Sequence, residues 1–251
     1  MKSFINNKKT YIILASVIVM LLLWEFASIR INSVHLLPGP LETLKAVANL
    51  FVTRDFLLII WNTVLRGLIG FLIAVILGMG LGIVAGLNPS FEYFMRPWIV
   101  VMRSVPVVSF ILLALIWFTS NSVPIFIGFL TMFPMIFTNI IEGMRNVDNK
   151  LIDMAKFYKI SQKRIVAEVY IPAIAPFVTS GISSAVGIGW RAIIVGEVLS
   201  QPEFGIGMSM HTAQSFLNVD VLIAWTFVAI LLSSLFEQII RFAERKIIRW
   251  R

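Results

Sequence analysis

Six long apolar segments, separated by short polar stretches, dominate this chain of 251 residues. They cover approximately residues 11–29, 56–87, 97–118, 123–141, 171–199 and 220–240. A helix needs about 20 apolar residues to cross the hydrocarbon core of a bilayer, and these segments have approximately that length. The chain is 59% hydrophobic and only 14% charged, which is more apolar than a soluble domain. The sequence therefore predicts an all-α integral membrane protein with six transmembrane helices.

The first 55 residues are organised differently from the rest of the chain. The apolar run that begins at Tyr11 is not followed by an Ala-x-Ala cleavage site, so we expect a retained membrane helix rather than a signal peptide. Pro38 and Pro40 end this helix, and the weakly amphipathic residues 41–52 are expected to lie along the outer membrane surface. We therefore divide the chain into an N-terminal helix with a surface segment, residues 1–55, and a five-helix core, residues 56–251.

Basic residues are concentrated on one side of the predicted helices. Six helices place both termini on one side of the membrane, together with Arg96 and the central loop, and this side carries fifteen Lys and Arg residues. The opposite side carries only Arg30, Lys45 and Arg54. Because cytoplasmic segments of membrane proteins are enriched in Lys and Arg, we expect a multi-pass protein of the cell membrane with both termini in the cytoplasm. The net charge of +8 then reflects membrane topology and gives no indication of nucleic-acid binding.

Small residues recur at every fourth position in two of the predicted helices. They are Gly78, Gly82 and Gly86 in the second helix, and Gly181, Ala185 and Gly189 in the fifth. This spacing strips one helix face of side chains and lets another backbone approach closely. We expect the two faces to pack together within the chain, and a dimer interface is the alternative. Pro106 and Pro134 predict bends in the third and fourth helices, while segments 88–96 and 200–219 are expected to be loops.

Three charged residues that lie within the predicted spans, toward their outer ends, are the strongest internal candidates for a functional role. Arg66 lies in the second helix, and Arg191 and Glu197 lie in the fifth. An ionisable group inside a membrane is costly and is usually paired or faces a cavity, so these residues are candidates for a pathway or gate. The alternatives are a structural ion pair between Arg66 and Glu197, or extension of the side chains to the membrane surface. Arg103 lies toward the cytoplasmic end of the third helix and is expected to reach that surface.

Sequence features of catalysis are missing. No Gly-Lys dipeptide occurs, so the chain lacks a phosphate-binding P-loop. His35 and His211 have no Cys or carboxylate at ligand spacing, and no Ser/His/Asp set or carboxylate pair converges in one segment. We therefore expect neither an enzyme nor a cofactor or metal site on this chain.

A long polar stretch, residues 148–172, separates the fourth and fifth apolar segments. Its apolar residues recur at helical spacing, which predicts two short amphipathic helices joined by a turn. Both helices are too short and too charged to cross a bilayer. They are expected either to bind a partner or the membrane surface, or to pack on the helix ends of this chain.

The same loop carries a motif of a known family. Asp153-Met154-Ala155, Lys159 and Val169-Tyr170-Ile171-Pro172 are spaced as in the E-A-A-x3-G-x9-I-x-L-P motif of permease subunits of binding-protein-dependent ABC importers, which this chain resembles. Residues 37–40, 103–106 and 205–207 resemble the branch that imports nitrate, sulfonates and taurine, so the resemblance covers nearly the whole chain. Lys159 replaces a glycine that closes a turn in the family, and a left-handed Lys costs on the order of 1 kcal/mol. We therefore expect the turn to be made differently or to be shifted by a residue.

The resemblance implies a type I ABC importer-like permease with a cytoplasmic two-helix coupling loop, residues 144–172. Such a chain forms the translocation pathway as a homodimer, together with an extracytoplasmic solute-binding protein and two copies of a separate ATPase that binds ATP and Mg²⁺. The residues implied in coupling to the ATPase are Leu151, Asp153, Met154, Ala155, Tyr158, Lys159 and Pro172. The implied cargo is a small anion such as nitrate, a sulfonate or taurine. Alternatives are a neutral heterocycle such as a thiamine precursor, a stand-alone secondary transporter that uses Arg66, Arg191 and Glu197, or a membrane scaffold that does not transport.

Overall fold

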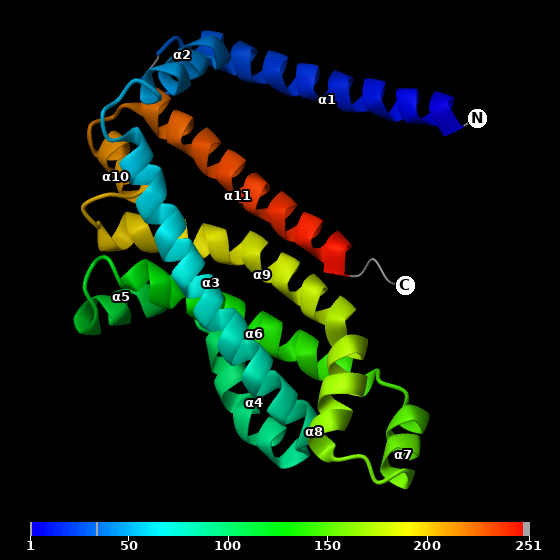
Figure 1. The fold of residues 1–251 in the computed structure, drawn as a ribbon. Coiled ribbons are helices and arrows are strands. Elements are labelled where there is room, and N and C mark those ends of the chain that lie inside the picture. Colours follow the sequence, from blue (N-terminus) through cyan, green and yellow to red (C-terminus); the bar gives the residue numbers. More distant parts are fainter. Residues whose placement is uncertain (1, 34, 248–251) are drawn as a thin grey trace. The chain divides into compact units, whose positions relative to one another are not determined.

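A computed structural model describes residues 2–33 and 35–247, with side chains for residues 10–33 and 35–242. The described chain is almost entirely helical, and no strand occurs in it (Figure 1). Its helices are α1 (Lys2–Ile31), α2 (Pro40–Leu50), α3 (Phe56–Leu87), α4 (Pro89–Ser104), α5 (Val107–Trp117), α6 (Val123–Arg145), α7 (Asn149–Phe157), α8 (Gln162–Ile165), the π-helix η1 (Val166–Tyr170), α9 (Ile171–Ser200), α10 (Ile206–Ser215) and α11 (Val219–Ile247). Arg249 and Arg251, which contribute to the expected orientation, lie outside the described residues.

Five of these helices are long and apolar enough to cross a membrane. The candidate spans are Thr10–Ile31, Phe56–Leu87, Val123–Arg145, Gln162–Ser200 and Val219–Phe242. The helices α4 and α5 pass the same test together, but they are bent by 102° at the break between them. The predicted all-α membrane fold is confirmed, and the count reaches six when the bent pair forms one span.

The third span differs from the single helix expected over residues 97–118. α4 begins within the expected loop, because Pro89 is placed in its first turn and the Asn88 side chain accepts hydrogen bonds from the amides of Ser90 and Phe91. The helix ends at Ser104, and the C-cap residue Val105 has an extended backbone with a φ of −74° and a ψ of 132°. A residue that precedes proline is forced out of the helical region, so Pro106 breaks the span instead of bending it.

The chain divides into two compact units, and the first comprises residues up to Leu57 together with Ser209–Ile230. In this unit the Trp24 indole donates a hydrogen bond to the Pro38 carbonyl at 3.0 Å, and the Ser28 hydroxyl donates to the Leu37 carbonyl at 2.9 Å. These bonds satisfy backbone carbonyls of the proline-rich turn that follows α1. α2 has 11 residues and is too short to cross a membrane, as the sequence predicts. The sequence analysis divided the chain at residue 55 and did not assign residues 209–230 to the N-terminal part. That division into two domains stays a prediction.

The second unit comprises Leu58–Met208 and residues from Leu231 onward, and α6 lies at its centre. Both small-residue faces pack against α6, so the prediction that they pack against each other is wrong. A methyl group added at Gly78 would lie 2.9 Å from Ile136, and one added at Gly181 would lie 2.8 Å from Asn139. The nearest neighbours of Gly82, Gly86 and Gly189 are likewise Ile140, Met144 and Met132 of α6. The spacing identified surfaces of close approach, but it carries no information about which helix occupies them.

Two connecting segments also differ from the expectation. Residues 200–219, expected to be a loop, contain α10. The second helix of the polar loop, α8, runs through η1 directly into α9, so it is the beginning of a long helix and not a separate element. α9 and α6 lie side by side and make an extensive contact (Figure 1).

Candidate functional site

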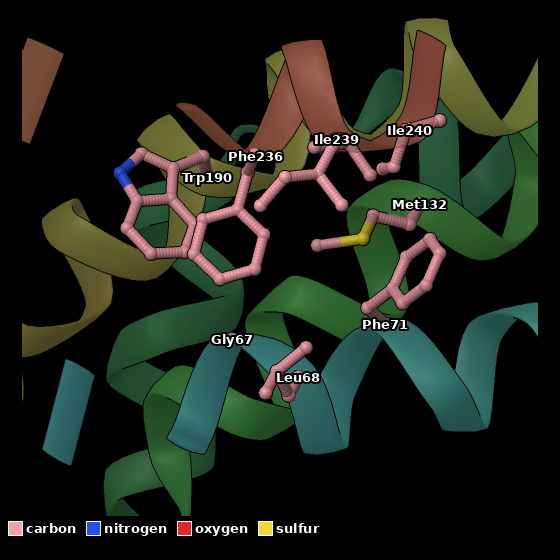
Figure 2. Close-up of a pocket in the computed structure, with 9 residues that line it drawn as sticks. Gly67, Leu68, Phe71, Met132, Trp190, Phe236, Ile239 and Ile240 are labelled. Carbon is pink, nitrogen blue, oxygen red and sulfur yellow. The ribbon is translucent and has the colours of Figure 1, made fainter. Parts of the chain in front are cut away.

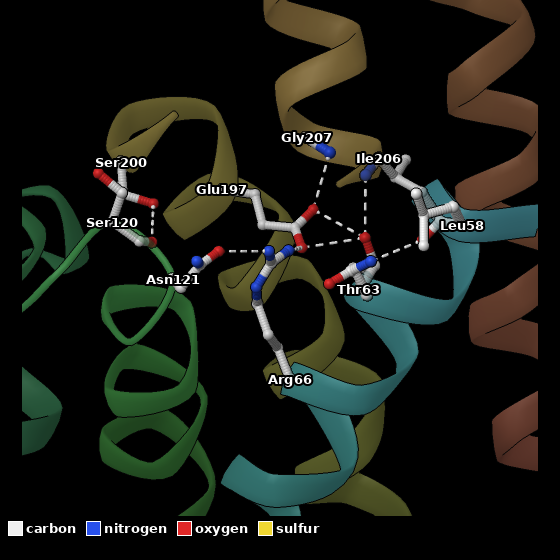
Figure 3. Close-up of polar contacts among 10 residues, drawn as sticks. Leu58, Thr63, Arg66, Ser120, Asn121, Glu197, Ser200, Ile206 and Gly207 are labelled. Carbon is white, nitrogen blue, oxygen red and sulfur yellow. Dashed lines mark hydrogen bonds and ion pairs between the residues drawn. The ribbon is translucent and has the colours of Figure 1, made fainter. Parts of the chain in front are cut away.

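A buried polar network lies at one end of the second unit, around Glu197 near the C-terminal end of α9 (Figure 3). The Glu197 side chain is fully buried and forms an ion pair with Arg66 of α3, with 2.6 Å between Oε1 and Nη1. The Thr63 hydroxyl lies 2.9 Å from both carboxylate oxygens. The second guanidinium nitrogen, Nη2, donates to the Asn121 side chain at 2.7 Å. The network therefore ties together α3, α9 and the turn that connects α5 with α6.

Backbone amides at the start of α10 complete this network. The amide of Gly207 donates to Glu197 Oε2, and the amide of Ile206 donates to the Thr63 hydroxyl, both at 2.9 Å. A methyl group added at Gly205 would lie 2.8 Å from the Glu197 carboxylate, and one added at Gly207 would lie 2.6 Å from Glu197 Cβ. Glycine is thus required at both positions for the backbone to reach the carboxylate. A nearby bond, from the Ser200 hydroxyl to the Ser120 carbonyl at 3.0 Å, also ties α9 to the α5–α6 turn.

The network pairs two of the three charged residues singled out in the sequence. Arg66 and Glu197 form the ion pair that was one of the alternatives, whereas Arg191 is exposed, six residues earlier in α9. Six residues correspond to a rotation of about 240° around a helix axis, so Arg191 faces another direction. The Glu197 carboxylate has at least one hydrogen bond on each oxygen, as a buried charge requires. Such a site can fix the relative positions of four segments, and it offers no free group for acid–base chemistry.

A separate apolar cavity of about 170 Å³ lies between α3, α6, α9 and α11 (Figure 2). Its lining residues are Gly67, Leu68, Phe71, Met132, Val186, Trp190, Phe236, Ile239 and Ile240. The Trp190 indole nitrogen points away from the cavity, and this buried nitrogen has no hydrogen-bond partner in the part of the chain that is described. A cavity without a polar group cannot compensate the desolvation of a charged solute, so it is not a site for an anion.

The opposite end of the unit carries the polar loop predicted to contact a partner. Asp148 caps α7 by accepting a hydrogen bond from the Lys150 amide at 2.9 Å. Ile152 and Ala155 are buried, and Ile152 belongs to the apolar core formed by α6 and α9. The large apolar and aromatic side chains that stay exposed on α7 and at its C-cap are Leu151 (47%), Met154 (55%), Phe157 (82%) and Tyr158 (71%). We refer to these four residues as the α7 surface.

The α7 surface and the predicted contact set share Leu151, Met154 and Tyr158. Ala155, predicted to face a partner, is only 4% exposed and packs inward. Phe157, which the spacing argument left out, is the most exposed of the four. Asp153 is exposed as well, and Pro172 is the second residue of α9. The helix thus uses one side to pack on its own chain and presents the other side to the surroundings.

Lys159 makes the turn that the family motif assigns to glycine, so the expectation of a different or shifted turn is wrong. Its φ is +53°, in the left-handed region. The Ile160 amide donates to the Ala155 carbonyl at 3.0 Å, and the Lys159 amide donates to the Lys156 carbonyl at 2.9 Å. These two bonds form a Schellman motif that closes α7. The hydrogen bonds and the packing of Ala155 offset a conformational cost on the order of 1 kcal/mol.

The residues that the sequence analysis missed are mostly polar partners distant in the chain. Thr63 and Asn121 complete the coordination of Arg66 and Glu197, yet neither has a charge that would mark it as unusual within an apolar segment. The one available signal was the Trp61-Asn62-Thr63 interruption of the second apolar run. Among the described residues, no group of three His, Asp or Glu side chains could hold a metal ion.

Comparison with known proteins identifies the family. Residues 70–249 match the family described as binding-protein-dependent transport system inner membrane component. The putative aliphatic sulfonates transport permease protein SsuC of Bacillus subtilis is 25% identical over 236 residues, which cover 93% of this chain and 85% of that protein. The bicarbonate transport system permease protein CmpB of Synechococcus elongatus is 27% identical over 254 residues, covering 94% and 88%. The taurine transport system permease protein TauC of Escherichia coli is 24% identical over 233 residues, covering 90% and 84%.

The family match extends over most of the chain, and the similar proteins align with it nearly from end to end. The matched residues, 70–249, include α7 and most of the Glu197 network. Thr63 and Arg66 of that network lie before the matched range. The candidate membrane-spanning helices agree with a multi-pass membrane component. The chain therefore belongs to the family of inner membrane components, the permease subunits, of binding-protein-dependent ABC importers.

Proposed function

We propose that this chain is the permease of an ATP-driven importer for a small anionic solute. The three similar proteins are named for aliphatic sulfonates, taurine and bicarbonate, and each of these solutes carries an anionic group. The sequence contains no phosphate-binding P-loop, so ATP and Mg²⁺ belong to a separate ATPase subunit. The chain itself supplies the membrane pathway and carries no catalytic activity.

The observation that carries the ATPase part of this proposal is the exposed α7 surface. Met154, Phe157 and Tyr158 are each more than half exposed on a helix whose other side is packed against the core. Large apolar side chains in water are unfavourable by about 25 cal/mol for each Å² of apolar surface, and grouped ones are typical of interaction sites. A nine-residue helix is too short to cross the bilayer, and with Asp153, Lys150 and Lys156 beside the α7 surface we assign its cover to a protein partner.

α9 is the element that connects the α7 surface with the Glu197 network. The polar loop continues through α8 and η1 into α9 without a break, and Glu197 lies near the far end of that helix. The distance along the axis from Ile171 to Glu197 is about 40 Å at 1.5 Å per residue. A displacement of α7 by the ATPase would move α9 as a rod and alter the contacts of Glu197 with Arg66 and Gly207. In this account the Arg66–Glu197 pair is part of a gate, and Arg191 is a pathway candidate outside the network.

The assembly that fits this role contains further subunits. It consists of two permease chains, two ATPase subunits and a solute-binding protein on the outer side. Both termini and the α7 surface lie in the cytoplasm, because the basic residues are concentrated at that side. The Glu197 network then lies toward the outer side, where the binding protein delivers the solute.

Reconstituted transport tests this proposal. The permease would be purified from its native host in mild detergent with its associated subunits and placed in liposomes with the binding protein. We expect uptake of taurine, an alkanesulfonate or bicarbonate only when ATP is present in the compartment that the ATPase subunits face. A neutral thiamine precursor serves as the solute control. Accumulation under an ion gradient without ATP, or uptake of the neutral solute alone, would contradict the proposal.

A further inference from the structure

A groove of about 380 Å³ lies between α4 and α6, apart from the Glu197 network and the α7 surface. Its lining residues are Glu92, Tyr93, Arg96, Ile99, Val100, Arg103, Phe137, Thr138, Ile141, Glu142 and Arg145. On α4 they recur every three or four positions, so one face of this helix forms the first wall and a face of α6 forms the second. The groove combines a row of arginines with an apolar floor.

The charges in the groove do not cancel. Arg145 is paired with Glu92 at 2.7 Å, and this pair joins α6 to α4. Arg96 and Arg103 lie seven residues apart, two turns along the same face of α4, and neither forms an ion pair with another described residue. Glu142 is the one acidic side chain of the groove outside the Arg145–Glu92 pair. One positive charge therefore remains uncompensated, and it has to be satisfied by water or by an anion.

The surroundings of the groove are those of a membrane interface. Ile99 and Ile141 are buried beneath it and supply apolar surface. Tyr93 and Trp98 of α4 are 70% and 58% exposed, and aromatic residues of this kind collect at the level of the lipid headgroups. The Arg145 end of α6 is followed within three residues by Asp148, the cap of α7. The groove thus lies at the same end of the unit as the polar loop.

We infer that this groove binds the headgroup of an anionic phospholipid. Arg96 and Arg103 would hold the phosphodiester, because a guanidinium donates in a fork that matches phosphate oxygens. The apolar floor would contact the upper part of an acyl chain, which a small inorganic anion does not need. Basic pockets between membrane helices at the cytoplasmic surface are suited to such headgroups. The inference depends on the membrane location of the family and does not depend on the cargo or on ATPase coupling.

Lipid titration of the purified, delipidated full-length chain tests this inference. Phosphatidylglycerol is compared with phosphatidylcholine of the same acyl chains, and binding is followed by native mass spectrometry and by thermal unfolding. We expect the wild type to bind phosphatidylglycerol preferentially, and Arg96→Gln/Arg103→Gln to bind it about thirty-fold more weakly. Arg54→Gln removes an exposed arginine elsewhere and should leave the affinity unchanged. Glu142→Gln should bind phosphatidylglycerol several-fold more tightly, because it removes the opposing charge.

Three results would overturn the inference. The first is equal binding of the two lipids by the wild type. The second is an unchanged phosphatidylglycerol affinity in the double variant, which would show that the arginines do not hold the headgroup. The third is protection of the wild type by millimolar inorganic phosphate to the same extent as by the lipid, since this would assign the arginines to a soluble anion. None of these measurements depends on transport, so the inference can fail while the proposed function stands.

Discussion

The Glu197 network and the α7 surface are connected through α8, η1 and α9, and they differ in what is buried and what is exposed. Around Glu197, charged groups are removed from water, and each is matched by partners within 3 Å. On α7, apolar side chains remain in water with no matching surface in the described chain. A buried ion pair is retained only if its geometry is satisfied, whereas an exposed apolar group is retained where a partner covers it.

This difference separates an internal structural network from the docking surface that we propose. The network should be sensitive to substitution in the isolated chain, because all of its partners are present there. The α7 surface should be insensitive in the isolated chain and sensitive in the complete assembly. The following predictions, from the largest expected effect to the smallest, each test one side of this comparison.

Removing one charge of the buried pair should have the largest effect on stability. Glu197→Gln and Arg66→Gln each leave a buried group without its partner, and we expect each to lower the free energy of unfolding by about 3–5 kcal/mol. The double variant should be less destabilised than the sum of the two, because the second substitution removes the unpaired charge. Thermal unfolding in detergent measures all three variants.

Glu203→Gln is the matched control for this cycle. Glu203 is exposed in the loop after α9, and its substitution should change stability by less than about 0.5 kcal/mol. Strict additivity of the Glu197 and Arg66 effects would show that the two residues do not act as a pair.

A smaller effect is expected when a methyl group is inserted into the network. In Gly207→Ala the new methyl would lie 2.6 Å from Glu197 Cβ, so the backbone must shift away from the carboxylate. We expect a loss of about 1–3 kcal/mol in stability, as for other overpacked sites. Gly187→Ala is the control, since no atom lies within 4 Å of a methyl group there and alanine favours the helix. Equal stability of the two variants would show that the amide of Gly207 does not have to approach Glu197.

The smallest effect concerns the turn at the end of α7. Lys159→Gly relieves the left-handed lysine, and we expect α7 to be stabilised by up to about 1 kcal/mol. Hydrogen exchange of the Ile160 amide, which donates to Ala155, should become slower. Lys163→Gly is the control, because position 163 lies inside α8 and glycine there should speed local exchange. Faster exchange of Ile160 in Lys159→Gly would indicate that the lysine side chain itself supports the turn.

Local patterns in the sequence predicted the long elements well. The bounds of α3 follow from its uninterrupted apolar run, and the start of α9 at Ile171 follows from the end of the polar stretch. The first half of α4 was missed because Asn88, Pro89, Glu92 and Arg96 are typical of a loop, although Asn88 caps the helix and Pro89 is its first residue. The sequence around Pro106 does not distinguish a proline that bends a helix from one that breaks it, so the break between α4 and α5 was not predicted.

Long-range pairing was less predictable. The four-residue spacing of Gly78 and Gly181 marks surfaces that admit a close neighbour, and α6 occupies both. The Arg66–Glu197 pair could be suggested because opposite charges in apolar segments need each other. The neutral partners of this pair, Thr63 and Asn121, could not be predicted, because a hydroxyl or amide side chain in an apolar segment does not need a specific partner. The periodicity of α7 did not predict that Ala155 is buried and Phe157 is exposed, because this depends on which side of the helix packs on the core.

The central claim is that the α7 surface binds the ATPase while the chain folds without it. The most direct test measures the amount of ATPase that co-purifies with each folded permease when Met154→Asp/Phe157→Asp is compared with the wild type. We expect the double variant to keep the unfolding temperature of the isolated wild type and to lose most of the ATPase, as for substitutions of central interface residues. Lys156→Asp, which makes the same change of net charge at an exposed position outside the α7 surface, should retain the ATPase. Undiminished recovery of the ATPase with Met154→Asp/Phe157→Asp would contradict the claim.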